Sequence, residues 1–293
     1  LPFFMGSSIF VDFDLDSSED IVKKIVEQIY TIAKFSTGKN IIVSVKYDTD
    51  DDSYADPVSN KIQLSLDVMY DHRIDIEARV NTVMGVGMHE IGHIVVTFPE
   101  LLDKLRSLGY MKTVMERVGQ MVQIPDASYS PFMPASNDAV LKYYMNDARV
   151  YAKANMIRLY TLQSLSNIFE DRRVNRKFCA EYPGYARYFD QYMQWASWNW
   201  LNAIRLNKTK LYQYDGKPFN DMKIISAVYE LCLMYWLIGK SAPKVWDEYI
   251  DSPVAKRCID ANPKLHYVMT AMMTMGEHET FADVMNAATE IYK

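Results

Sequence analysis

The first hundred residues combine two kinds of hydrophobic pattern. Residues 41–47 are rich in β-branched side chains and residues 61–67 alternate between apolar and polar positions, which predicts two β-strands, the second half-exposed. Isoleucines recur at helical spacing over residues 18–34, which predicts an amphipathic helix. A further short strand is expected at residues 9–13, and a solvated acidic loop at residues 48–56. The pattern therefore predicts a small α/β lobe built on a twisted sheet.

From residue 98 onward almost every segment has helical periodicity. The expected helices cover about residues 100–121, 137–162, 163–178, 185–206, 221–239, 243–259 and 280–292, with Pro or Gly at several of the breaks between them. We therefore expect an α+β fold of two lobes that together form one domain: an α/β lobe at residues 1–97 and a larger, mainly helical lobe at residues 98–293.

A helix at the junction of the two lobes carries the most distinctive chemistry. It is expected to begin near residues 74–77 and to end around Thr97, because Phe98-Pro99 follows. Gly85 and Gly87 lie inside it and each costs about 1 kcal/mol in helix propensity, a cost that close passage of another backbone would explain.

The same helix contains the sequence HEIGH at residues 89–93, which holds two of the five histidines of the chain. Residues four apart leave the same face of a helix, so His89 and His93 can occupy two corners of a tetrahedral Zn²⁺ site. Glu90 lies at the flank of that face, where its carboxylate can reach a metal-bound water. The hydrophobic residues around the motif indicate a buried helix, and buried imidazoles need partners.

A zinc site with two histidines needs a third protein ligand, and residues 167–175 (NIFEDRRVN) offer one. Glu170 would share a buried environment with apolar neighbours, and Asp171 could accept the N–H of a ligating imidazole. Alternatively, these two acids form a surface salt-bridge cluster with Arg172 and Arg173. Asp147 is a second, shorter candidate for the third ligand.

Charge and composition exclude some classes of function. The formal net charge is −5 and the chain has no basic block, which argues against nucleic-acid binding. The longest apolar run, residues 224–238, contains Glu230 and is shorter than a bilayer requires, so we expect a buried core helix and no membrane association. Three widely spaced cysteines without a C-x-x-C pair are typical of free thiols in the cytoplasm.

These motifs resemble a known family. HEIGH at residues 89–93, followed by Thr97 and by the pattern N-x-x-E-D-x-R-V at residues 167–174, is similar to the gluzincin-type metallopeptidases predicted in bacteria and phages, which often precede a von Willebrand factor A-like domain, and to their cobaltochelatase-associated relatives. The resemblance implies a zincin-like fold in which His89, His93 and Glu170 bind zinc, Glu90 is the general base and Asp171 holds a ligating imidazole. Asn175 stands where the pattern commonly has an acid.

The function implied is a zinc-dependent metallopeptidase that hydrolyses proteins or peptides, with a von Willebrand A-like domain or an ATPase as a further partner. The candidates for stabilising the oxyanion are Tyr182, Tyr185, Tyr188 and His266, although in a chain with 21 tyrosines each tyrosine is more typical of a packing residue. Two alternatives remain: a metal-binding but catalytically silent module that acts in protein assembly, and a metal-free helical interaction protein.

Overall fold

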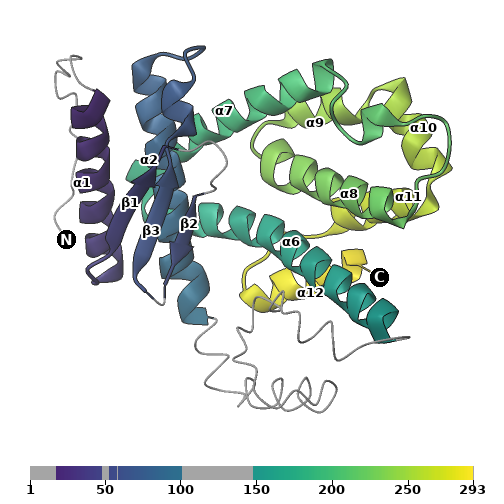
Figure 1. The fold of residues 1–293 in the computed structure, drawn as a ribbon, viewed down its shortest axis with the longest axis horizontal. Coiled ribbons are helices and arrows are strands. Elements are labelled where there is room, and N and C mark those ends of the chain that lie inside the picture. The colour runs from purple at the N-terminus through teal and green to yellow at the C-terminus, as the bar shows by residue number, and fades with distance from the viewer. Residues whose placement is uncertain (1–17, 48–52, 58, 101–147, 293) are drawn as a thin grey trace.

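The computed structural model describes residues 18–47, 53–57, 59–100 and 148–292, of which Figure 1 shows the arrangement. The strand expected at residues 9–13, the helix expected over about residues 100–121 from residue 101 onward, and the alternative ligand Asp147 lie outside the described residues.

A three-stranded sheet forms the centre of the N-terminal lobe. It contains β1 (Ile42–Lys46), β2 (Tyr54–Asp56) and β3 (Lys61–Ser65) in the order β1-β3-β2. β3 is parallel to β1 and antiparallel to β2. β2 was expected to be loop, but the last residues of the acidic stretch pair with β3 as an edge strand.

β3 is the central strand, and the prediction that it is half-exposed is wrong. Ile62 and Leu64 are fully buried, and Gln63 on the opposite face is also buried. The hydroxyl of Tyr54 in β2 donates a hydrogen bond to Gln63 Oε1 (3.3 Å), which satisfies the polar group that the alternating pattern had assigned to solvent.

Two helices pack against each other and against this sheet: α1 (Ser18–Thr37) and α2 (Ile76–Gly92) (Figure 1). α2 continues as a π-helical turn, His93–Thr97, and residues 98–100 are again α-helical. The expected stop at Phe98-Pro99 is therefore wrong. The π turn shifts the backbone hydrogen bonds by one residue just before Pro99, which has no N–H to donate to an ordinary α-helical turn.

The C-terminal lobe is helical, and two of its predicted boundaries are wrong. α6 (Ala148–Glu181) is one helix across residue 162, where no Gly or Pro interrupts it. The single helix expected over residues 243–259 is two helices, because Ser252 caps a new one by accepting from the N–H of Ala255 (3.0 Å), with Pro253 as its first residue. The remaining helices are α7 (Ala186–Arg205), α8 (Asp221–Cys232) with a π-helical continuation (Leu233–Gly239), α9 (Pro243–Ile250), α10 (Pro253–Ala261), α11 (Pro263–Thr274) and α12 (Phe281–Tyr292).

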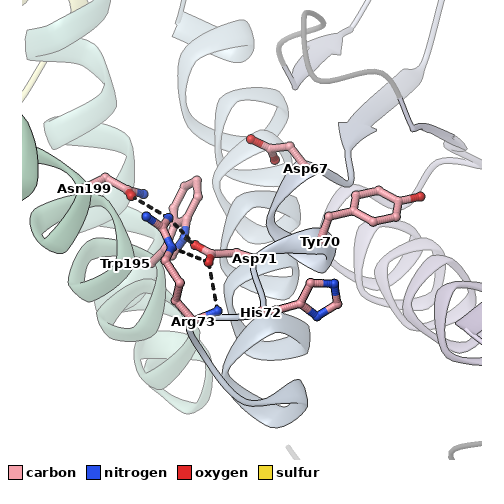
Figure 2. A pocket seen from close by; sticks show the side chains of 7 residues that line it. All are labelled: Asp67, Tyr70, Asp71, His72, Arg73, Trp195 and Asn199. Atoms are coloured by element: carbon pink, nitrogen blue, oxygen red, sulfur yellow. Dashed lines mark hydrogen bonds and ion pairs between the residues drawn. The ribbon is translucent and has the colours of Figure 1, made fainter.

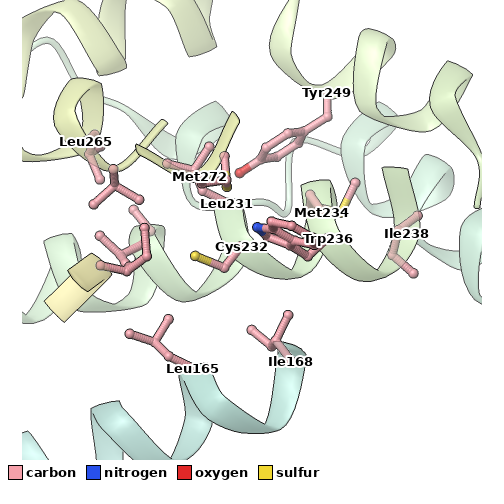
Figure 3. Packing of buried hydrophobic residues seen from close by; sticks show 14 of the residues in the cluster. Leu165, Ile168, Leu231, Cys232, Met234, Trp236, Ile238, Tyr249, Leu265 and Met272 are labelled. Carbon is pink, nitrogen blue, oxygen red and sulfur yellow. The ribbon is translucent and has the colours of Figure 1, made fainter. Parts of the chain in front are cut away.

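Each lobe has its own hydrophobic core. The helical core surrounds α8 and its π-helical continuation, with Leu231, Cys232 and Trp236 fully buried at its centre (Figure 3). Among the described residues, the 19-residue stretch Asp221–Gly239 is long and apolar enough to cross a membrane, contrary to our expectation for its length, and half of its apolar window is buried in the protein. The N-terminal core includes the sheet, α1 and α2, and also Phe178 and Phe189 from α6 and α7.

Glycines in α2 allow three other helices to approach it closely. A Cβ atom at Gly85 would collide with the carbonyl oxygen of Tyr188 in α7, and one at Gly87 would lie 2.5 Å from Ile29 in α1. A Cβ atom at Gly92 would lie 2.5 Å from Val174 in α6. The expected close passage of a backbone is thus confirmed at Gly85 and wrong at Gly87, where a side chain lies close instead.

We predict that Gly85→Ala lowers the free energy of unfolding by about 1–3 kcal/mol, because the methyl group meets the backbone of α7, which cannot rotate away as a side chain can. Alanine has the better helix propensity, so a loss of stability would report the collision alone. Gly184→Ala is the matched control, since no atom lies within 4 Å of its Cβ position. Urea denaturation measures both, and equal stability of the two variants would contradict the prediction.

Candidate metal centre

Two imidazoles and one carboxylate converge where α2 meets α6. His89 and His93 come from the last turn of α2 and the start of the π turn, and Asp171 comes from α6. The two Nε2 atoms lie 3.1 Å apart, and Asp171 Oδ1 lies 3.6 Å from that of His89 and 3.2 Å from that of His93. The absence of a side chain at Gly92 lets α6 come this close to α2.

Hydrogen bonds on the far side of each ring decide which nitrogen carries the proton. His89 Nδ1 lies 2.7 Å from Asn175 Oδ1, an acceptor, so this nitrogen is the donor. His93 Nδ1 lies 3.2 Å from the hydroxyl oxygen of Thr97, whose own proton is donated to Glu170 Oε1. Thr97 therefore accepts from His93 Nδ1. In the neutral form of each ring, Nε2 is then an unprotonated acceptor.

Three acceptors consequently face one another with no proton between them, and such a site requires a cation. Without a metal the cation is a proton. Burial opposes protonation of His89, but the hydrogen bond and charge of Asp171 outweigh it and raise the pKa of His89 to about 9. Burial likewise opposes ionisation of Asp171, but the two imidazoles hold the pKa of Asp171 well below its usual range.

The spacing of the three atoms also fits a divalent metal. Two ligands at 2.0–2.1 Å from a tetrahedral Zn²⁺ lie about 3.3 Å apart. The three separations here, 3.1, 3.2 and 3.6 Å, are close to that value. His89, His93 and Asp171 form a group whose potential ligand atoms all lie within 4.8 Å of one another. Two imidazoles and a carboxylate are a common ligand set of catalytic zinc.

Glu170, which we expected to be the third ligand, does not face the histidines. It is buried and accepts two hydrogen bonds from Arg173, of 2.6 and 2.7 Å, as well as the hydroxyl proton of Thr97. Neighbouring residues on a helix point about 100° apart, so Glu170 and Asp171 do not both reach the two imidazoles. In this structure Asp171 faces the two histidines, and Glu170 faces Arg173 and Thr97 instead.

Asn175 was noted in the sequence only as a departure from the family pattern. In the structure it orients His89. It follows Asp171 by four residues on α6, and this spacing places the two side chains on one helix face, which is the signal that could have identified it.

Glu90 is buried between the histidine cluster and the edge strand β2. Its side chain and backbone together are 6% exposed, and its carboxylate accepts the N–H of Ala55 in β2. Burial raises the pKa of Glu90, while the nearby imidazoles of His89 and His93 act in the opposite direction. Glu90 is thus adjacent to the candidate metal position without sharing the ligand cluster, as expected of a general base.

The tyrosines proposed as oxyanion donors are engaged in aromatic packing. Tyr182, Tyr185 and Tyr188 form an aromatic cluster with Phe178 in the N-terminal core. His266 is exposed on α11. The tyrosine next to the histidines is Tyr192, whose ring centre lies 6.5 Å from that of His89. Sequence reasoning missed Tyr192 because its position depends on the packing of α7 against Gly85.

A pocket of about 560 Å³ lies at the other end of α2 (Figure 2). Four of its polar side chains bond to one another: Asp71 accepts from Arg73 (2.6 and 2.7 Å) and from Trp195 (3.0 Å), and Arg73 also donates to Asn199 (3.2 Å). The bonds to Arg73, which outweigh burial, hold the pKa of Asp71 well below its usual range. These contacts fasten the start of α2 to α7, and we assign the chemistry to the histidine cluster instead.

Comparison of the chain with known protein families, curated proteins and solved structures finds no match, so the resemblance to the gluzincin-type metallopeptidases rests on the two motifs alone.

Proposed function

We propose that the chain is a zinc-dependent metallopeptidase in which His89, His93 and Asp171 hold the metal and Glu90 is the general base. One observation carries the proposal: both Nε2 atoms and Asp171 Oδ1 converge, while Asn175 and Thr97 lie beside the Nδ1 atoms and so favour the tautomers whose neutral Nε2 can bind a metal. This is the arrangement that zinc sites use, in which the outer hydrogen bond of each imidazole sets its orientation and basicity.

A zinc ion bound here would supply a Lewis acid that lowers the pKa of a water toward 7. The remaining chemistry belongs to the chain. Glu90 takes the proton of the attacking water and passes it to the departing amine nitrogen. Burial keeps the pKa of Glu90 above its usual value, which favours this exchange, and the N–H of Ala55 fixes the orientation of its carboxylate. Tyr192 is the candidate donor to the tetrahedral oxyanion.

The position of β2 favours an extended peptide as substrate. β2 is an edge strand of the sheet, and its N–H at Ala55 contacts the general base. An extended chain can pair with an edge strand through backbone hydrogen bonds, which would lay a peptide bond beside Glu90. Among the described strands β1 and β2 are the two edges of the sheet, and β2 is the edge beside Glu90.

Metal removal and restoration test the proposal. We expect the purified chain to hold about one zinc and to cleave an unfolded protein such as reduced, alkylated lactalbumin. Incubation with a chelator should abolish cleavage, and added Zn²⁺, but not Mg²⁺, should restore it, because imidazole ligands favour zinc over magnesium. A chain that binds no zinc under any condition would contradict the proposal. Full zinc occupancy without cleavage would instead favour the catalytically silent assembly module.

A further inference from the structure

A buried positive charge lies directly behind the candidate metal centre. The side chain of Arg173 is fully buried on α6, and its guanidinium contacts two carboxylates. It donates two hydrogen bonds to Glu170 (2.6 and 2.7 Å) and one to Glu100 Oε1 (2.7 Å). A buried guanidinium requires such partners, so Glu170 and Glu100 are held in place by the charge between them.

On one side, hydrogen bonds connect Arg173 to the metal centre. Glu170 accepts the hydroxyl proton of Thr97, and this leaves the Thr97 oxygen to accept from His93 Nδ1. Arg173 therefore fixes Glu170, and Glu170 fixes the donor direction of Thr97. The tautomer and orientation of His93 depend on a chain of three residues, none of which belongs to the ligand cluster.

On the other side, hydrogen bonds connect Arg173 and its partner Glu100 to residues 277–281, which follow α11 and include the first residue of α12. Arg173 donates to the carbonyl oxygen of Glu279 (3.3 Å), and Glu100 Oε2 accepts the N–H of Phe281, the first residue of α12 (2.8 Å). Arg176, one turn along α6, donates to the carbonyl of His278 (2.8 Å) and to Glu279 Oε1 (2.7 Å). α12 packs along α6 (Figure 1), so the segment is fastened to the helix that carries Asp171.

We propose that Glu100 and Arg173 are positioning residues that couple the metal centre to the segment 277–281. The inference rests on the proposed metal site. When the segment is docked, Glu100 and Arg173 hold Glu170, Thr97 and His93 in the geometry that binds metal. Coupling between two sites is reciprocal, so bound metal must in turn stabilise the docked segment. A protein or peptide that displaced the segment would thereby weaken metal binding without touching the metal centre.

The test compares Glu100→Gln with Glu277→Gln. Glu277 belongs to the same segment but pairs with Arg172 (3.2 Å) and Arg176 (3.9 Å), whereas Glu100 pairs with Arg173 (2.7 Å), which makes Glu277 the matched control. We expect Zn²⁺ affinity, measured by chelator competition, to fall by about 10- to 100-fold in Glu100→Gln, as is typical when an outer partner of a ligand is lost, and to remain near wild type in Glu277→Gln.

Hydrogen exchange at the amide of Phe281 gives a second measurement that does not depend on activity. In the wild type, added Zn²⁺ should slow exchange at this amide, and the effect should be lost in Glu100→Gln. If Glu100 only supported the fold, added Zn²⁺ would slow exchange at the Phe281 amide in Glu100→Gln as much as in the wild type. Wild-type affinity and wild-type zinc dependence in Glu100→Gln would overturn the inference, as would equal loss of affinity in both variants. Failure of the wild type to bind Zn²⁺ would instead overturn the proposed function.

Discussion

Glu90→Gln is expected to reduce cleavage of an unfolded protein by about 10²–10⁴-fold while the chain keeps its zinc, because the amide cannot accept the proton of the attacking water. Glutamine has nearly the same size as glutamate and can still accept the N–H of Ala55, so the buried position between β2 and α2 should stay packed. Cleavage rate and zinc content are measured on the same preparation.

Glu77→Gln is the control for this variant, since Glu77 is exposed in the first turn of the same helix and distant in sequence from the ligands. It should cleave at the wild-type rate. Undiminished cleavage by Glu90→Gln would exclude Glu90 as the general base. Loss of both zinc and cleavage would assign Glu90 to the support of the ligand cluster.

Replacing Asp171 by Asn should have the largest effect on metal binding. The variant loses the charged oxygen that lies 3.2 and 3.6 Å from the two imidazole Nε2 atoms, so the affinity for Zn²⁺ should fall by well over 100-fold. Glu170→Gln should weaken binding less, by about 10- to 100-fold, because Glu170 acts on His93 only through Thr97. Chelator competition measures both affinities.

The variant with the larger loss of Zn²⁺ affinity shows whether Asp171 or Glu170 is the third ligand. If the affinity for Zn²⁺ fell more in Glu170→Gln than in Asp171→Asn, Glu170 would be the third ligand, as the family resemblance implies. The side chains of Glu170 and Asp171 would then have to rearrange when the metal binds. Circular dichroism of each variant shows whether a loss of affinity comes with a loss of helix.

The candidate site could be found from the sequence only as far as local geometry reaches. The spacing of His89 and His93 is a property of one helix, and it put both imidazoles on the same face before any tertiary contact was considered. The partner on α6 is different, because residues 170 and 171 are both acidic and either could have been turned toward α2. The rotation of α6 about its own axis, fixed by contacts such as that of Gly92 with Val174, made the choice.

The same distinction applies to the fold. Helical and strand periodicity determined the order and type of most described elements, the α+β class and the burial of the junction helix, because these depend on the local pattern of apolar residues. Only the tertiary structure decided that β3 is the central described strand, that residues 54–56 form an edge strand, and that a buried arginine links the histidines to the start of α12. Each of these features depends on contacts between segments far apart in the chain. The hydrophobic pattern within one segment does not specify which other segment packs against it.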